Sequence, residues 1–173
     1  MKRTICLMLV FLFLASLSAC YYSESGDILE PVEFFYPRKP DYFVYGADDG
    51  VLAAEVREGS GHIGDLYYLL SMYLRGPQDE TLRSPFPEGC KLKDVRFEED
   101  MLRIVLSAEF TTLENVDLTI ACASLTKTCM NLVDVRLVSI KASGNKKSVS
   151  ITMDAEALLL SDYSAFEVNP VTE

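Results

Sequence analysis

The hydrophobic pattern of this chain switches between the period of a β-strand and the period of an α-helix, which leaves few possible folds. Two stretches have helical spacing. The first runs from Ile63 to Leu74 and is expected to end at Gly76-Pro77. The second spans about residues 114–132, and one of its faces carries Leu118, Ala121, Cys122, Leu125, Cys129 and Leu132. Each predicted helix therefore has one apolar face that must be buried.

Short stretches with strand composition surround the two predicted helices. The first stretch is flanked by Pro31 and Pro37 and is expected at a sheet edge, because proline cannot donate a backbone hydrogen bond. The third and fourth stretches are expected to form one hairpin, closed by a charged turn. The fifth and sixth are expected to form a second hairpin, closed by a turn that contains Gly-Asn. The predicted strands are residues 32–36, 51–56, 91–97, 102–107, 135–141 and 148–153.

The segment between the first helix and the next strand, residues 78–89, is expected to be an ordered or mobile loop, with an ordered turn at residues 85–89. Pro85 and Pro87 fix two of its φ angles. Gly89 is expected to adopt a positive φ, which other residues resist.

The resulting order is β-β-α-loop-β-β-α-β-β, which predicts the α+β class. We expect a two-layer sandwich with two helices packed on one face of a mostly antiparallel sheet. One domain is predicted over residues 32–153, followed by a C-terminal extension, residues 154–173, that is expected to fray at its end.

The N-terminus has the pattern of a signal peptide. Lys2 and Arg3 precede an apolar run at residues 5–17, which is too short for a transmembrane helix. The run ends in Leu17-Ser18-Ala19-Cys20, which resembles the lipobox of bacterial lipoproteins, where the cysteine is linked to diacylglycerol. We expect removal of residues 1–19, lipidation of Cys20 and a membrane-proximal tether at 20–31. The alternative is an ordinary secretory signal with a coincidental cysteine.

The charge balance limits the partners. The chain has 16 Lys+Arg against 26 Asp+Glu and a net charge of −10, which excludes nucleic acid as a partner. Anionic headgroups also repel such a chain, so the lipid on Cys20 is expected to hold it on the extracytoplasmic face of the cell membrane. Two acyl chains suffice for stable anchoring.

Residue types that serve catalysis are sparse. His62 is the single histidine, so a metal pair or a His-based triad is hard to build. Cys122 and Cys129 share a helical face but lie about 10 Å apart along the axis, so we expect them to be buried and not paired with each other. Cys90 is the remaining candidate for a reactive thiol, without an evident base beside it. We therefore expect no catalytic residues, no metal and no cofactor.

Two other groups have alternative interpretations. The acidic clusters lack the spacing of a calcium loop and are expected to be solvated turns. An aromatic cluster around Pro37 and Pro40 could stack on sugar rings, or could instead fill the core or cover a sheet edge. The acidic clusters are Asp48-Asp49, Asp79-Glu80 and Glu98-Glu99-Asp100, and the aromatic residues are Tyr36, Tyr42, Phe43 and Tyr45.

Four short motifs together resemble the GerMN domain of sporulation and spore-germination lipoproteins, over about residues 32–153. The typical pattern has Leu-x-Gly-Pro, Pro-x-Gly-Thr, Ser-x-x-Phe and Val-x-x-Val; here Cys90 stands where Thr is usual, and Leu132 where the first Val is usual. The motifs are Leu74-Arg75-Gly76-Pro77, Ser84-Pro85-Phe86-Pro87-Glu88-Gly89-Cys90-Lys91-Leu92, Ser107-Ala108-Glu109-Phe110 and Leu132-Val133-Asp134-Val135.

This resemblance implies a fold like the ring-building motifs of spore secretion complexes, with the order α-β-β-α-β. It also implies a non-catalytic assembly or binding module, with protein partners or self-association, on the outer face of a membrane. The alternative is a lipoprotein that binds a cell-wall glycan or a small molecule through the 78–89 loop and the aromatic cluster. An exposed apolar strip would favour assembly, and a concave aromatic pocket would favour ligand binding.

Overall fold

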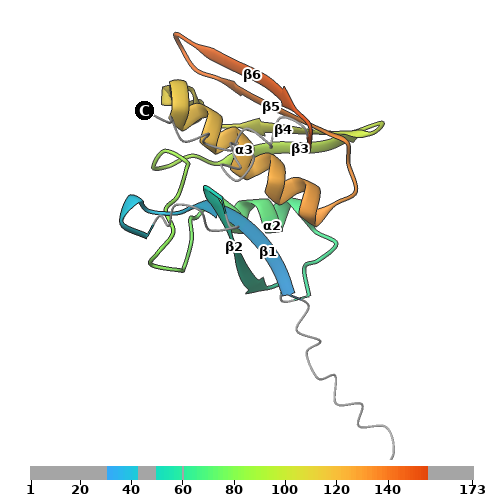
Figure 1. Ribbon diagram of the computed structural model, residues 1–173. Helices are drawn as coiled ribbons and strands as arrows, with labels where there is room; N and C mark the ends of the chain where they lie inside the picture. The colour runs from blue at the N-terminus through green and yellow to red at the C-terminus, as the bar shows by residue number, and fades with distance from the viewer. Residues whose placement is uncertain (1–30, 43–49, 60, 156–173) are drawn as a thin grey trace, which may run out of the picture.

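The computed structural model describes residues 31–42, 50–59 and 61–155 (Figure 1). The signal peptide, Cys20 and almost all of the tether and of the C-terminal extension lie outside the described residues. The α+β class is confirmed, because the helices α2 (Leu66–Tyr73) and α3 (Asn115–Leu132) pack against mostly antiparallel strands.

The strands form two sheets instead of the single sheet expected from the sequence. One sheet pairs β1 with β2, and the other has the order β3-β4-β5-β6. Only the β4–β5 pair is parallel among these strands, and the crossover between them contains the short 3₁₀ helix η3 (Ala108–Thr112) and α3. The bounds are β1 Pro31–Pro37, β2 Leu52–Glu58, β3 Leu92–Glu98, β4 Met101–Leu106, β5 Leu137–Ser143 and β6 Ser148–Met153; a second 3₁₀ helix, η2, spans Pro40–Tyr42.

Helix α3 lies between the two sheets, so the molecule has three layers (Figure 1). The four-stranded sheet covers one side of the helices, and the β1–β2 sheet covers the other. All residues from 121 to 126 of α3 are buried, as expected for a helix enclosed on all sides. The expected two layers become three because β1 and β2 pack on the far side of α3.

The free edge of β1 explains why this strand does not join the larger sheet. The Phe35 backbone N–H donates to Thr128 Oγ1 at 2.9 Å, and the Tyr73 hydroxyl donates to the Phe35 carbonyl at 2.8 Å. Helix side chains thus satisfy backbone groups that another strand would otherwise pair with. The predicted edge position of this strand is confirmed.

Helix α2 begins later than its hydrophobic spacing suggests. Asp65 is the N-cap, and its carboxylate accepts a hydrogen bond from the Tyr68 N–H at 2.9 Å. Ile63 consequently precedes the helix and is 42% exposed. Helix α3, in contrast, occupies almost the whole predicted range, with Glu114 as its N-cap.

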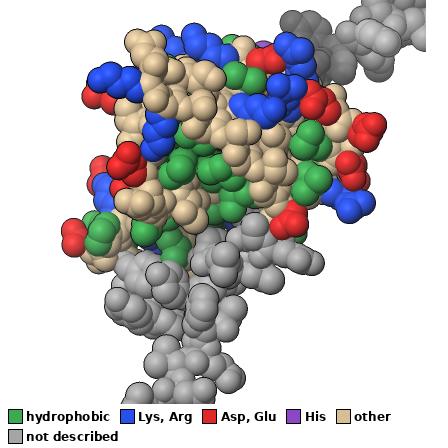
Figure 2. Space-filling view, turned by 90° about the horizontal axis from the view of Figure 1, so that it is seen from above, with side chains coloured by type: hydrophobic (Ala, Val, Ile, Leu, Met, Phe, Trp, Pro, Cys, Tyr) green, Lys and Arg blue, Asp and Glu red, His purple; other side chains and the backbone are tan. Residues whose placement is uncertain are grey.

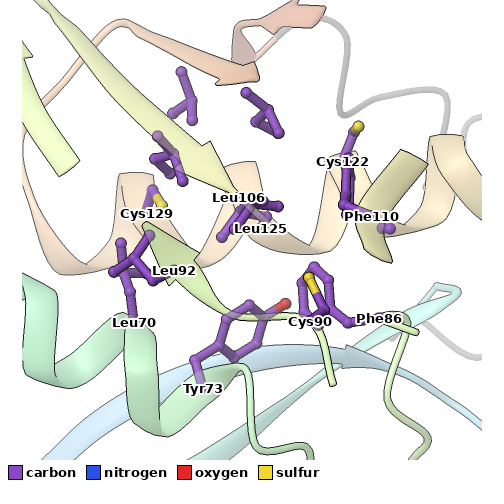
Figure 3. Packing of buried hydrophobic residues seen from close by; sticks show 14 of the residues in the cluster. Leu70, Tyr73, Phe86, Cys90, Leu92, Leu106, Phe110, Cys122, Leu125 and Cys129 are labelled. Atoms are coloured by element: carbon purple, nitrogen blue, oxygen red, sulfur yellow. The ribbon is translucent and has the colours of Figure 1, made fainter. Parts of the chain in front are cut away.

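Charged side chains of both signs lie around the margin of the face seen in Figure 2, and hydrophobic side chains gather near its middle. Inside the molecule, one hydrophobic cluster joins both sheets and both helices. Figure 3 shows Tyr73, Phe86 and Cys90 close together in this cluster, with Leu106 and Leu125 beside them. The loop that follows α2 therefore contributes to the core.

Candidate functional site

A half-open groove of about 680 Å³ lies between α2 and residues 84–92, and we call it the α2 groove. Both sides of the groove come from segments that carry the GerMN-like motifs. Its lining residues are Tyr67, Ser71, Leu74 and Arg75 on one side, and Ser84 with residues 86–92 on the other.

The turn at Gly76-Pro77, which ends the α2 side of the groove, is held by a buried ion pair on β2. Glu55 and Arg57 are each only 8% exposed, and they form a hydrogen-bonded salt bridge with each other. Arg57 Nη2 donates to the Gly76 carbonyl at 2.7 Å. Glu55 Oε2 accepts from the N–H groups of Gln78 and Asp79 at 2.8 and 2.7 Å. The pair therefore fixes three backbone groups of one turn.

Aromatic rings enclose the Arg57 guanidinium. It lies 5.3 Å from the centroid of the Phe34 ring and 5.6 Å from that of Tyr36, distances at which cation–π attraction acts. The Tyr36 hydroxyl accepts from Arg57 at 3.3 Å and donates to the Tyr73 carbonyl at 2.7 Å. Burial raises the pKa of Tyr36 well above its ordinary value, although the nearby Arg57 opposes this shift. Tyr36 therefore remains a neutral donor in the core.

Sequence reasoning missed Glu55 and Arg57. It treated residues 51–56 as an apolar strand, which would bury Val56, but Val56 is 61% exposed. The available signal was the alternation of Ala53, Glu55 and Arg57, which places these side chains on one face of a strand. Nothing in that alternation identifies the backbone groups of residues 76–79 as their partners.

The other side of the groove contains a tight turn at residues 87–90. The Cys90 N–H donates to the Pro87 carbonyl at 3.1 Å, and Gly89 has a φ of 79°. A positive φ at the third residue is the requirement of a type II turn. The prediction that Gly89 takes a positive φ is confirmed, and the 84–89 segment is an ordered loop.

Side chains from distant segments hold this turn in place. The Ser107 hydroxyl accepts from the Lys91 N–H at 2.9 Å, and the Ser107 N–H donates to the Lys91 carbonyl at 2.9 Å. Phe86 meets the Tyr73 ring edge-on at 5.3 Å and lies 6.4 Å from Phe110. The motif residues Ser107 and Phe110 thus contact the loop at residues 84–91 and hold it in place.

The described cysteines are buried thiols. Burial raises the pKa of Cys90 to about 11, an effect that a hydrogen bond from Ser107 partly offsets. Burial likewise raises the pKa of Cys122 to about 12 and that of Cys129 further. The expected burial of Cys122 and Cys129 is confirmed. Cys90, the remaining candidate for a reactive thiol, is packed in the core, where burial disfavours the thiolate that such reactivity needs.

The remaining polar candidates lie apart from one another. His62 is exposed and stacks on Tyr68, with ring centroids 3.9 Å apart. Asp79 accepts hydrogen bonds from the N–H and hydroxyl of Thr81, which lower the pKa of its carboxyl. The hydrogen bond from Arg103 to Glu98 likewise lowers the pKa of Glu98. These two acidic clusters lie in turns, as expected, and Asp48-Asp49 falls outside the described residues.

The aromatic cluster is not an accessible surface as a whole. Tyr36 is fully buried and Tyr42 is 49% exposed, while Phe43 and Tyr45 fall outside the described residues. Among residues 31–42, 50–59 and 61–155, no group of three or more His, Cys, Asp or Glu side chains is arranged to hold a metal ion. Neither described helix has the length and apolarity needed to cross a bilayer.

Two solved structures illustrate what this chain is similar to. One is the tandem GerMN domains of the sporulation protein GerM from Bacillus subtilis, with a TM-score of 0.48 and 19% identity over 70% of this chain. This chain covers 44% of the length of that protein. The other is a candidate lipoprotein from Clostridium perfringens, with a TM-score of 0.47 and 14% identity over 81% of this chain and 98% of that one.

A comparison with curated proteins gives no match. A family model named Germane, described as sporulation and spore germination, matches residues 42–148. This range includes both sides of the α2 groove, the Ser107 and Phe110 supports, and all of α3. Because the match spans more than half of the chain, the protein belongs to the Germane family of sporulation and spore germination.

Proposed function

We propose that this protein is a lipoprotein anchored through Cys20 to the outer face of the cell membrane. In this proposal it acts in sporulation, spore germination or envelope assembly by binding protein partners or further copies of itself, without catalysis. The observation that carries the proposal is that the motif residues have structural roles in the walls of the α2 groove. Gly76, Gly89, Ser107 and Phe110 shape and support one groove instead of presenting reactive groups.

The chemistry of the described side chains supports a contact role. The Arg57 and Glu55 charges are buried against each other and against backbone groups, and burial favours the protonated thiols of Cys90, Cys122 and Cys129. Catalysis needs a nucleophile and a base held within mutual reach. The hydrophobic side chains gathered in Figure 2 are the kind of surface that protein contacts use.

Anchoring is tested by replacing Cys20. The wild-type chain should fractionate with membranes and begin at a lipid-modified Cys20, as mass spectrometry of its N-terminal peptide would show. The Cys20→Ala chain should remain uncleaved or be released. An unmodified N-terminus at another position in the wild-type protein would overturn the lipoprotein assignment.

Contact and catalysis are separated by a second experiment. On lipid vesicles, anchoring raises the effective concentration, so self-association is expected there and not in dilute solution. Turnover of a peptidoglycan or ester substrate that persists through rigorous purification would overturn the non-enzyme assignment.

A ligand-binding lipoprotein is the second candidate, and the α2 groove is the observation that favours it, because its volume would admit a small molecule. The burial of Tyr36 weighs against sugar stacking at the aromatic cluster. Strict monomers on vesicles at high surface density, together with a raised melting temperature in the presence of a cell-wall fragment, would favour this candidate.

A further inference from the structure

We infer that the α2 groove binds an extended peptide segment of a partner protein, one that places a carboxylate beside an apolar side chain. This inference rests on the proposed role as a contact module and adds the chemistry of the partner. It depends on three features of the groove: its apolar lining, its cations and its fixed backbone.

The lining of the groove is mainly apolar. Leu74 and Pro87 are half-buried at its walls, and Phe86 and Leu92 are buried beneath it. The Tyr67 ring closes one side and is held there by a hydrogen bond from its hydroxyl to the Leu92 carbonyl at 3.2 Å. Such a lining favours an apolar side chain of the partner, because binding removes apolar surface from water on both sides.

Two cations lie at the groove. Arg75 and Lys91 are exposed there, and within the described part of the chain neither side chain forms an ion pair. Glu88 is the one acidic residue in the lining, and Glu109 lies beside Gly89 at the edge of the groove, where Lys91 and Lys93 attract its carboxylate. Arg75, Lys91 and the neighbouring Lys93 outnumber Glu88 and Glu109 by one charge, on a chain whose net charge is −10. This local excess of positive charge complements a partner carboxylate and repels a basic segment.

The backbone on both sides of the groove is fixed before any partner arrives. Arg57 and Glu55 hold the turn after α2, and Ser107 holds Lys91 through two backbone-directed hydrogen bonds. A groove that is already ordered loses little conformational entropy on binding. This arrangement suits recognition of a short segment by a small surface.

The apolar lining also decides between a peptide and an anionic polymer. A polymer of phosphate groups would use Arg75 and Lys91 but would leave Leu74, Phe86 and Pro87 without contacts. A peptide can satisfy both the cations and the apolar walls with neighbouring side chains.

The test is selection of phage-displayed random peptides on the full-length lipidated chain in detergent micelles. Selected peptides should share an Asp or Glu adjacent to Leu, Phe or Tyr. The Arg75→Glu/Lys91→Glu chain should bind them about tenfold more weakly or worse, and the charge-neutral Arg75→Gln/Lys91→Gln chain should show an intermediate loss. Raising NaCl from about 50 mM to about 500 mM should also weaken binding.

A matched control is Lys146→Glu, which reverses an exposed cation on the turn between β5 and β6 and should leave peptide affinity unchanged. Circular dichroism and thermal melting confirm that each variant is folded. Selected peptides without acidic residues, or with affinities unaffected by both Arg75/Lys91 double variants, would overturn the inference. Failure of selection to enrich any peptide, or binding of short poly(glycerol phosphate) at Arg75 and Lys91 instead, would also overturn it. Membrane fractionation of the same preparations reports on Cys20 anchoring separately, so the two proposals can fail independently.

Discussion

The Arg57 guanidinium is the side chain on which the groove depends most. Replacing it with Met would leave the Glu55 carboxylate buried beside an apolar group and the Gly76 carbonyl without its donor. We expect Arg57→Met to lower the free energy of unfolding by about 3–5 kcal/mol, because it removes one partner of a buried pair. Urea denaturation measures this change.

A double variant gives the matched comparison. In Glu55→Leu/Arg57→Met the buried charges are gone, but the N–H groups of Gln78 and Asp79 still lack acceptors. Stability should therefore recover only in part. Full recovery would mean that the pair does not serve to hold the 76–79 turn.

The positive φ of Gly89 predicts the effect of a side chain at this position. A Cβ atom would meet only Glu109 Cγ at 3.9 Å, which is an ordinary contact, so the cost comes from the backbone. Gly89→Val is expected to destabilise the protein by about 1–3 kcal/mol. Gly64→Ala is the control, since its Cβ would meet nothing within 4 Å. Equal melting temperatures of wild-type and Gly89→Val protein would contradict the turn geometry.

The buried thiols predict how stability depends on pH. An unfolded Cys122 loses its proton near its ordinary pKa of 9.0, but burial raises its pKa to about 12 in the folded state. The folded chain thus keeps protons that the unfolded chain releases, so stability is fully present below pH 9 and falls above it. Each thiol on α3 should contribute a slope of up to about 1.4 kcal/mol per pH unit.

This slope can be assigned by comparing wild-type protein with Cys122→Ala in urea denaturation between about pH 8 and pH 11. The variant should show a shallower decline above pH 9, after allowance for a constant packing loss. Identical slopes in the two proteins would contradict the assignment.

Individual residues were predictable from the sequence where their conformation depends on neighbouring residues. The positive φ of Gly89 follows from the prolines around it and from the conformational freedom of glycine. The burial of Cys90 and the partners of Glu55 depend on chain segments far away in the sequence, such as Ser107 and residues 76–79. Contacts of this kind depend on how distant segments pack together, and the hydrophobic spacing within one segment does not predict them.

At the scale of elements, the edge of β1 offers a specific test. Thr128→Val keeps the side-chain shape but removes the acceptor of the Phe35 N–H. We expect it to destabilise the protein by up to about 1–3 kcal/mol, because a partly buried donor loses its acceptor. Thr128→Ser retains the hydroxyl acceptor and should destabilise the protein less than Thr128→Val. Hydrogen exchange at the Phe35 amide measures the effect directly, and unchanged protection in Thr128→Val would show that this bond does not close the edge.

The helices and strands themselves were largely predictable, because their hydrophobic residues recur at the clear spacing of a helix or a strand. Helix α3 and both later hairpins occupy nearly the expected ranges. Helix α2 is shorter than expected, because Asp65 caps it after Ile63. The division into two sheets was not predictable, since it depends on which strand edges α2 and α3 cover.

At the scale of the whole molecule, the β1–β2 sheet, helix α2 and the four-stranded sheet converge on the α2 groove. The β1–β2 sheet supplies the ion pair, α2 supplies one side, and Ser107, directly after β4, holds the other side. The candidate site as a whole was only partly visible in the sequence. Its motifs were recognisable, but their common groove and its cations appear only in three dimensions.

The central claim is that the anchored chain works through contact at this groove, and photo-crosslinking in the cells that make the protein tests it most directly. A photoreactive residue at Ser71, inside the groove, should crosslink to a polypeptide in the membrane fraction. The crosslink should disappear in Arg75→Glu/Lys91→Glu and in Cys20→Ala, and a photoreactive residue at Asn145 on the β5–β6 turn should give none. Absence of any crosslink from Ser71, or a crosslink that persists unchanged in both variants, would contradict the account.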